Sequence, residues 1–123
     1  MHSIWVADDD EAIRLILEES LTSSGFETKS FSSGEELIKE LDATQPDLII
    51  TDVQMPGMLG YDLLKHINNN YEDIPVIIMT AFADMQAAVE SFGGGAFEYL
   101  PKPFDLEEAL SLIHISEPTR RTD

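Results

Sequence analysis

Hydrophobic residues gather in five short runs along the chain, and a segment with helical spacing follows each run. The runs lie near residues 3–8, 26–31, 47–52, 75–80 and 97–100. The third and fourth runs contain continuous apolar stretches rather than alternating ones, which is typical of parallel strands buried on both faces. The pattern therefore predicts strands and helices that alternate along the chain.

The predicted helices have recognisable ends. In residues 11–24 apolar side chains recur at helical spacing up to Gly25, which provides a stop. The fourth helix must end at the three glycines of residues 93–95. Three polar residues are expected to cap the second, fourth and fifth helices: Ser33 (with Glu36 as its capping-box partner), Asp84 and Asp105.

Five strand–helix repeats in 123 residues predict a three-layer α/β sandwich with a five-stranded parallel sheet, five helices and right-handed crossovers. The flavodoxin-like strand order 2-1-3-4-5 puts the switch point between the first and third strands. We expect one domain over residues 1–113. Residues 114–123 are polar and interrupted by Pro118, so we interpret them as a truncated helix end, a linker or a tag-like tail.

The composition narrows the classes of function. The formal net charge is -17, from 7 Lys and Arg against 24 Asp and Glu, so the domain should repel nucleic acid rather than bind it. The absence of cysteine excludes disulfides and thiolate metal sites. No apolar stretch reaches the length of a membrane span, and no secretory signal is evident, so we expect no membrane partner and a cytoplasmic location.

Acidic residues stand where the first and third strands are expected to end. Asp8 and Asp9 follow the first run, and Asp52 closes the third. Two unit charges about 4 Å apart repel by about 4 kcal/mol at an effective dielectric near 20, so such a cluster needs a cation. Oxygen ligands without His or Cys suit Mg²⁺, with Mn²⁺ as an alternative. The acidic triplet of residues 8–10 would by itself equally fit a favourable helix start.

A carboxylate in this position can also accept a phosphoryl group when a metal ion and cations neutralise the developing charge. Asp52 is the candidate acceptor. Lys102 is the only Lys or Arg between Lys65 and Arg120, so we expect it to pair with Asp52 at rest and with phosphoryl oxygens afterwards. A cis bond to Pro103 would suit this placement. Thr80 ends the fourth strand and could bond the phosphoryl group.

These motifs together resemble the receiver domain of bacterial two-component response regulators over residues 3–113. The resemblance rests on the Asp8-Asp9 pair, on Asp52 followed by Met55-Pro56-Gly57, on Thr80-Ala81, and on Lys102-Pro103-Phe104. Within that family, residues 95–104 look most like the nitrogen regulatory protein C (NtrC) class, which activates sigma-54-dependent transcription in nitrogen regulation.

The resemblance implies a phosphoacceptor signalling domain that assists only its own phosphorylation and dephosphorylation and is not an enzyme in its own right. Asp52 would take a phosphoryl group from a phosphohistidine of a sensor histidine kinase. Asp9, Asp52 and the backbone carbonyl of Gln54 would ligate Mg²⁺, while Asp8 would act mostly through bound water. Lys102 and Thr80 would contact the phosphoryl group.

The resemblance also implies a switch. Thr80 and Tyr99 would shift together and change the face formed by the fourth helix, the fifth strand and the fifth helix. In the NtrC class the output is an ATPase domain and a helix-turn-helix DNA-binding domain, and neither lies within these 123 residues. The apolar side of residues 82–92 would suit a reversible homodimer that forms on phosphorylation. Phe82, at the rim of the site, and Gln54 are expected to set the phosphorylated lifetime.

Three alternatives stay open at this point. A haloacid dehalogenase-type phosphohydrolase uses similar groups and places its nucleophile after the first strand as Asp-x-Asp, usually with a cap domain. Here Asp8-Asp9-Asp10 lacks the Gly-Thr that should follow, and no cap fits in the length. A pseudo-receiver that only binds proteins would be expected to lack an acid, Asp52 or Lys102. A flavodoxin would need a Ser/Thr/Gly-rich phosphate loop after the first strand, and this sequence has none there.

Overall fold

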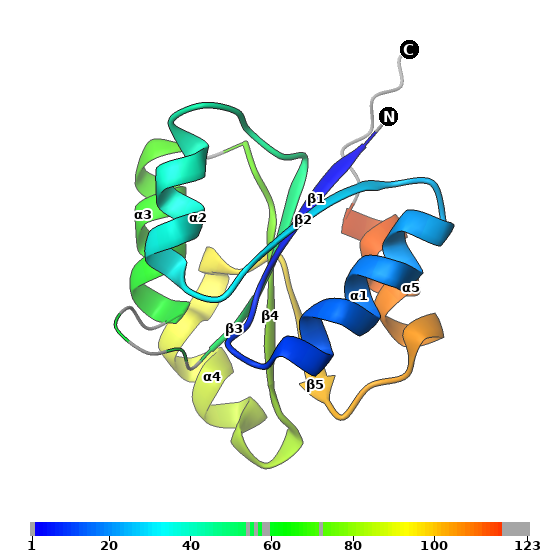
Figure 1. The fold of residues 1–123 in the computed structure, drawn as a ribbon. Helices are drawn as coiled ribbons and strands as arrows, with labels where there is room; N and C mark the ends of the chain where they lie inside the picture. Colours follow the sequence, from blue (N-terminus) through cyan, green and yellow to red (C-terminus); the bar gives the residue numbers. More distant parts are fainter. Residues whose placement is uncertain (1, 54, 56, 58–59, 72, 117–123) are drawn as a thin grey trace.

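The computed structural model describes residues 2–53, 55, 57, 60–71 and 73–116, and these form alternating strands and helices (Figure 1). The strands are β1 (Ser3–Ala7), β2 (Glu27–Phe31), β3 (Leu48–Asp52), β4 (Val76–Ala81) and β5 (Glu98–Lys102). The helices are α1 (Glu11–Ser23), α2 (Gly34–Leu41), α3 (Gly60–Asn70), α4 (Met85–Phe92) and α5 (Leu106–Ser116). Short 3₁₀ turns flank α4, η1 (Phe82–Asp84) before it and η2 (Gly93–Gly95) after it.

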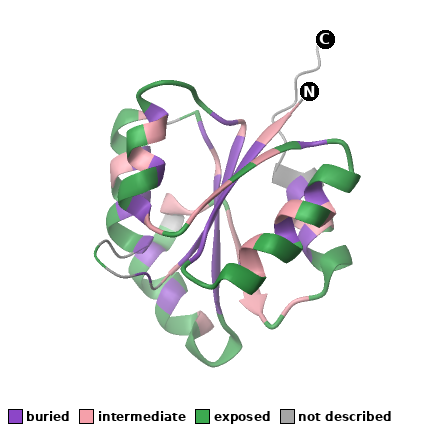
Figure 2. Cartoon of the chain, viewed as in Figure 1, coloured by how far each residue is buried: buried purple, intermediate pink, exposed green. Residues whose placement is uncertain are grey.

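All neighbouring strands pair in parallel, in the order β2-β1-β3-β4-β5, which confirms the predicted fold. Helices α1 and α5 cover one face of the sheet, and α2, α3 and α4 cover the other (Figure 1). The sheet is therefore the buried middle layer of three, as the burial colouring in Figure 2 shows. This burial on both faces explains why the central strands are continuously apolar.

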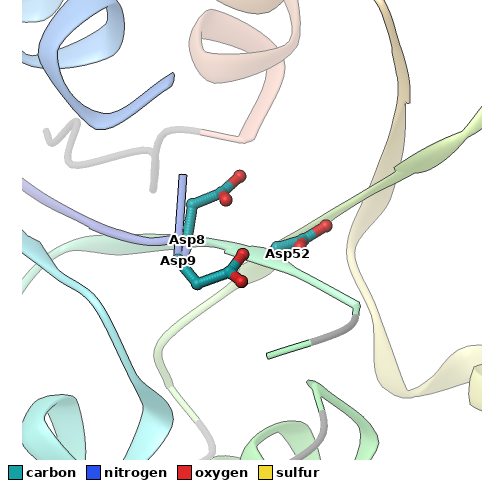
Figure 3. A group of neighbouring side chains, drawn as sticks. All are labelled: Asp8, Asp9 and Asp52. Atoms are coloured by element: carbon teal, nitrogen blue, oxygen red, sulfur yellow. The ribbon is translucent and has the colours of Figure 1, made fainter. Parts of the chain in front are cut away.

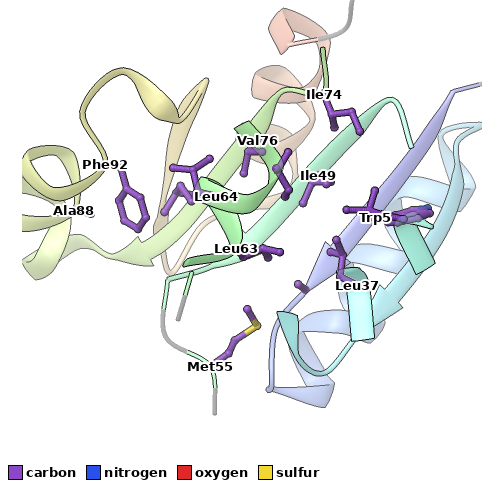
Figure 4. Close-up of a cluster of buried hydrophobic side chains, with 14 residues drawn as sticks. Trp5, Leu37, Ile49, Met55, Leu63, Leu64, Ile74, Val76, Ala88 and Phe92 are labelled. Atoms are coloured by element: carbon purple, nitrogen blue, oxygen red, sulfur yellow. The ribbon is translucent and has the colours of Figure 1, made fainter. Parts of the chain in front are cut away.

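Successive side chains of each strand supply opposite cores. In β1, Trp5 and Ala7 join the core beneath α2, α3 and α4, whereas Ile4 and Val6 join the core beneath α1 and α5. Figure 4 shows the first of these cores, where Trp5, Ile49 and Val76 from three adjacent strands meet the helix residues. The two cores hold the sheet rigid, so the ends of its strands are fixed points for a site.

Two of the three predicted caps are present. The Ser33 hydroxyl accepts a hydrogen bond from the Glu36 amide at 3.3 Å, and the Asp105 carboxylate accepts one from the Glu108 amide at 2.7 Å. The Glu36 side chain reaches back to Ser32 rather than to Ser33, so the predicted capping box is displaced by one residue.

The predicted cap at Asp84 is wrong. Asp84 does precede α4, but its side chain makes no capping hydrogen bond. The reason is the 3₁₀ turn η1, which ends at Asp84 and gives it φ -102° and ψ 5° instead of the extended backbone that a capping residue needs. At the other end of α4, Gly93 has φ +55°, a conformation that favours glycine, so the predicted stop is confirmed.

Helix α5 continues to Ser116, three residues beyond the boundary proposed at residue 113. Residues 117–123 lie outside the described part, so their assignment as a linker or tag-like tail stays a prediction. Among the residues described, none of the helices combines the length and the apolar character that crossing a bilayer requires.

The unequal caps lead to a stability prediction. Asp105→Ala should lower the free energy of unfolding by about 1 kcal/mol, because it leaves the Glu108 amide without its acceptor. Asp84→Ala removes the same charge from the start of a helix but no capping bond, so its loss should be only a few tenths of a kcal/mol. Urea denaturation of both variants measures their free energies of unfolding. Equal losses would show that the bond from the Glu108 amide to Asp105 does not stabilise α5.

Candidate functional site

The candidate site lies at the edge of the sheet where the parallel strands end. Ala7 of β1 pairs with Thr51 of β3, so the residues that follow, Asp8 and Asp52, are neighbours. Strand β5 ends at Lys102 beside the end of β4, at the same edge. The topology therefore brings together residues that are far apart in the sequence.

Three carboxylates meet at this edge. One ligand oxygen from each of Asp8, Asp9 and Asp52 lies within 4.8 Å of the others, and Figure 3 shows the side chains at the ends of β1 and β3. Asp8 is fully buried, Asp52 is 8% exposed, and Asp9 is open to solvent. Oxygen donors alone, with one exposed side for retained waters, fit Mg²⁺ or Mn²⁺.

Lys102 binds two of these carboxylates. Its Nζ donates to Oδ2 of Asp8 at 2.8 Å and to Oδ1 of Asp52 at 3.2 Å. The sequence led us to expect only Asp52 as the resting partner, but the shorter contact is to Asp8. The peptide bond between Lys102 and Pro103 is cis, as anticipated.

The net effect of burial and neighbouring charges is to raise the pKa values of both Asp52 and Lys102. Burial and the neighbouring Asp8 charge raise the pKa of Asp52 above its ordinary value, although the charge and hydrogen bond of Lys102 act to lower it. Burial acts to lower the pKa of Lys102, but the hydrogen bond to Asp8 and the charges of Asp52 and Asp8 outweigh it and raise that pKa. Lys102 is thus held as a cation, while Asp52 bears an electrostatic cost that a bound cation would relieve.

Asp8 is also tied to its surroundings through its backbone and its second oxygen. Its Oδ1 accepts a hydrogen bond from the Asp10 amide at 2.9 Å, and its carbonyl oxygen accepts one from Nη1 of Arg14 at 2.7 Å. Sequence reasoning missed Arg14. The argument that singled out Lys102 could have found it, because Arg14 is the only Lys or Arg before Lys29.

Thr80 lies beside the carboxylates with an unsatisfied hydroxyl. The residue is 1% exposed, and within the described residues its Oγ1 has no hydrogen-bond partner. Leaving a buried hydroxyl unpaired costs about 1–3 kcal/mol, so such a group marks a place for a ligand or a partner. Thr80 also lines a pocket of about 310 Å³ between β4, α3 and α4, which Tyr61 and Phe92 line as well.

The remaining predicted residues are Tyr99, Phe82 and Gln54. The Tyr99 hydroxyl donates to the Gly93 carbonyl at 3.2 Å, and its ring lies 6.5 Å from that of Phe92, centroid to centroid. Phe82 is 75% exposed at the start of η1. Gln54, the expected carbonyl ligand and lifetime residue, lies outside the described residues.

Gly60, the first residue of α3, lies close to the backbone at the end of β3. The Gly60 amide donates to the Val53 carbonyl at 2.9 Å. A Cβ at Gly60 would lie 2.7 Å from the Asp52 carbonyl oxygen and 2.8 Å from Cα of Val53, so only glycine fits there without movement. The start of α3 is thereby fixed against the end of β3.

Comparisons with known proteins agree with this geometry. Residues 4–114 match the family model described as "Response regulator receiver domain". The chain is 47% identical to the DNA-binding transcriptional regulator NtrC of Proteus hauseri over 111 residues, which cover 90% of the chain and 24% of the relative. It is 48% identical to the Klebsiella pneumoniae protein of the same name over 109 residues, with 89% and 23% covered. The chain therefore spans about a quarter of the length of these curated relatives.

Solved structures give the same result. The solution structure of the apo receiver domain of nitrogen regulatory protein C superposes with a TM-score of 0.85 at 44% identity, covering 94% of this chain and 93% of that one. The response regulator protein TrrA from Thermotoga maritima, in complex with Mg²⁺-BeF, gives a TM-score of 0.85 at 31% identity, with 94% and 99% covered.

The raised pKa of Asp52 predicts a pH-dependent stability. Asp52 holds its proton more tightly in the folded protein than in the unfolded chain. The protein therefore loses stability as the pH rises through the pKa that Asp52 has in the folded state. Without divalent cations, Asp52→Asn should therefore exceed wild type in stability at neutral pH, on the order of 1 kcal/mol. The gain should vanish as the pH falls below 3.8, the ordinary carboxyl value.

Urea denaturation across this pH range measures the effect. The exposed Asp73→Asn variant serves as the charge-matched control. An Asp52→Asn variant that is no more stable than this control at neutral pH would show that Lys102 fully compensates the buried charge.

Proposed function

The chain belongs to the response regulator receiver domain family and is of the NtrC type, and we propose that Asp52 accepts a phosphoryl group from a phosphohistidine of a sensor histidine kinase. The observation that carries the proposal is the position of Lys102, which bridges Asp8 and Asp52 at the edge where Asp9 stays open. Receiver domains are signalling domains rather than conventional enzymes, so the conclusion concerns transfer to this protein and not turnover of a substrate.

The acidic cluster is the place for the metal ion. Asp9 and Asp52 would hold Mg²⁺ (or Mn²⁺), Asp8 would hold it mostly through water, and the Gln54 carbonyl would complete the protein ligands. When bound, the ion neutralises charge on the transferring phosphoryl group. The ligand oxygens within 4.8 Å of one another support this assignment, as does the Mg²⁺-BeF complex of the related TrrA.

The transfer itself requires little of the protein beyond position and charge. A carboxylate oxygen of Asp52 attacks phosphorus and forms the acyl phosphate P–O bond, while the P–N bond breaks and its electron pair returns to the imidazole of the donor. Lys102 then exchanges its bond to Asp52 for one to a phosphoryl oxygen, and it keeps Asp8 as its second partner. The Thr80 hydroxyl, which has no partner within the described parts of the chain, donates to another phosphoryl oxygen, and this bond removes its desolvation cost.

Movement of Thr80 would carry the signal to the face formed by α4, β5 and α5. Thr80 and Phe92 line the same pocket, and Phe92 contacts Tyr99, which is bonded to Gly93 at the end of α4. A shift of Thr80 toward the phosphoryl group changes the support of α4, and Tyr99 moves with it. Phosphorylation then shifts the balance between two arrangements of this face.

The output follows from the relatives, which are DNA-binding transcriptional regulators about four times as long as this chain. In the whole protein, this domain would control a sigma-54-activating ATPase domain and a helix-turn-helix domain in nitrogen regulation, in the cytoplasm. A reversible homodimer would form through the α4 side of the phosphorylated domain, where Phe82 and Val89 are 75% and 43% exposed.

Intact-mass measurement tests the phosphoacceptor proposal. Incubation with a small phosphoryl donor such as acetyl phosphate should add one phosphoryl group to wild type only when Mg²⁺ is present, and none to Asp52→Asn. Asp73→Asn, which removes an exposed carboxylate away from the site, should react like wild type. A folded wild-type protein that gains no mass would instead favour a pseudo-receiver that only binds other proteins.

Phe82 should lengthen the phosphorylated lifetime, because a large exposed ring two residues after Thr80 would obstruct the approach of water to the acyl phosphate. Phe82→Ala and Phe82→Glu are expected to speed dephosphorylation several-fold, on the order of 1 kcal/mol in the barrier. Phe97→Ala is the control, since this exposed ring precedes β5 at the opposite end of the sheet. Decay of the phosphorylated mass with time gives the rates, and unchanged rates would refute the role of Phe82.

A further inference from the structure

Arg14 is a cation that reaches back from α1 to the end of β1. Its Nη1 donates to the carbonyl oxygen of Asp8 at 2.7 Å, although six residues separate the two in the sequence. The Asp8 carbonyl lies beyond the β1 ladder, which ends at Ala7, and before α1, which begins at Glu11. Arg14 therefore satisfies a partly buried backbone acceptor that the regular elements leave open.

The bonded carbonyl belongs to the peptide that joins Asp8 to Asp9. The Asp8 residue is held on several sides, because its amide donates to the Phe31 carbonyl at 3.0 Å and its carboxylate binds Lys102 and the Asp10 amide. Asp9 is different. Its carboxylate is exposed and, within the described residues, makes no hydrogen bond to another group. The direction of the Asp9 side chain therefore depends on the backbone. Arg14 fixes the plane of the Asp8–Asp9 peptide, because it bonds the carbonyl of that peptide.

We propose that Arg14 is a positioning residue for the metal ion, which holds the Asp8–Asp9 peptide so that the Asp9 carboxylate stays within reach of Asp8 and Asp52. The inference rests on the proposed function, because it assigns Asp9 to the ion that phosphoryl transfer needs. Removing a group that hydrogen-bonds a metal ligand and orients it commonly weakens the binding of the metal about tenfold or more. Arg14 acts in this way through a ligand's backbone rather than through its side chain.

The positive charge of Arg14 has the opposite effect on the affinity for Mg²⁺. A guanidinium bonded to the backbone of Asp8 repels a cation that approaches the acidic cluster, so its charge alone weakens binding of Mg²⁺. If charge dominates, removing Arg14 tightens Mg²⁺ binding. If the hydrogen bond to the Asp8 carbonyl dominates, removing Arg14 loosens it. The geometry favours the second outcome, since the bond is short and the charge is partly open to solvent, where salt screens it.

Calorimetric titration of the folded domain with Mg²⁺, at fixed ionic strength and without a phosphoryl donor, separates the two effects. Arg14→Met keeps the aliphatic stem but removes the charge and the donor, and it should raise the Kd for Mg²⁺ about tenfold. Arg14→Lys keeps the charge but loses the guanidinium fork, and it should give an intermediate Kd. Lys39→Met, in the last turn of α2, removes the same charge away from the site and should leave the Kd near the wild-type value.

Each result decides something different. Unchanged or tighter binding by Arg14→Met overturns the positioning role, even if thermal denaturation shows that the variant is less stable, because a purely structural role would move stability without loosening the ion. If Arg14→Met does not fold, Arg14→Lys decides alone, since a wild-type Kd in that variant also refutes the proposal. A wild-type domain that binds no Mg²⁺, or binds it equally well as Asp52→Asn, would overturn the proposed function itself.

Discussion

Repulsion among Asp8, Asp9 and Asp52 is the constraint around which this edge of the sheet is built. Carboxylates held within 4.8 Å of one another repel by several kcal/mol at the dielectric of a protein surface. The domain offsets part of this cost with Lys102, which bonds two of the three carboxylates, while the third, Asp9, is exposed to solvent. Folding alone does not demand such a cluster, so its cost is a sign that the arrangement serves a function.

The rest of the fold makes that cluster possible. Two hydrophobic cores fix the sheet from both sides, and parallel pairing brings the ends of β1, β3, β4 and β5 to one edge. The absence of a side chain at Gly60 lets α3 begin against the backbone of Asp52 and Val53. The carboxylates are therefore held by elements that are themselves difficult to displace, and an ion or phosphoryl group meets a prepared geometry.

Much of this arrangement could be predicted from the sequence. Continuous apolar runs indicate parallel strands, and parallel strands place the residues that follow them side by side, so the proximity of Asp8 and Asp52 follows from topology alone. The partners of Lys102 could be predicted only in part. Its isolation indicated a specific partner, but the shorter bond to Asp8 depends on how the loop after β1 turns.

The remaining features depend on local backbone geometry that residue spacing does not encode. Aspartate is a residue type that often caps helices. The turn before α4, however, gives Asp84 a backbone conformation in which its side chain does not cap the helix. The isolation of Arg14 in the sequence could have singled this residue out, but its partner is a backbone carbonyl, which the order of side chains does not reveal. Tyr99 could be assigned to a strand, but its bond to Gly93 depends on where the glycine turn after α4 runs.

The weak anchoring of α4 has a consequence for how the domain can change shape. Among the described residues, this helix has no side-chain cap like those of α2 and α5, it is followed by three glycines, and a pocket lies against it. Little packing enthalpy is lost when such a helix slides, whereas a shift of the strands would disturb both cores. The domain thus combines a stiff sheet, which keeps the carboxylates in register, with a loosely held helix, which could shift at little cost if the proposed phosphoryl transfer takes place.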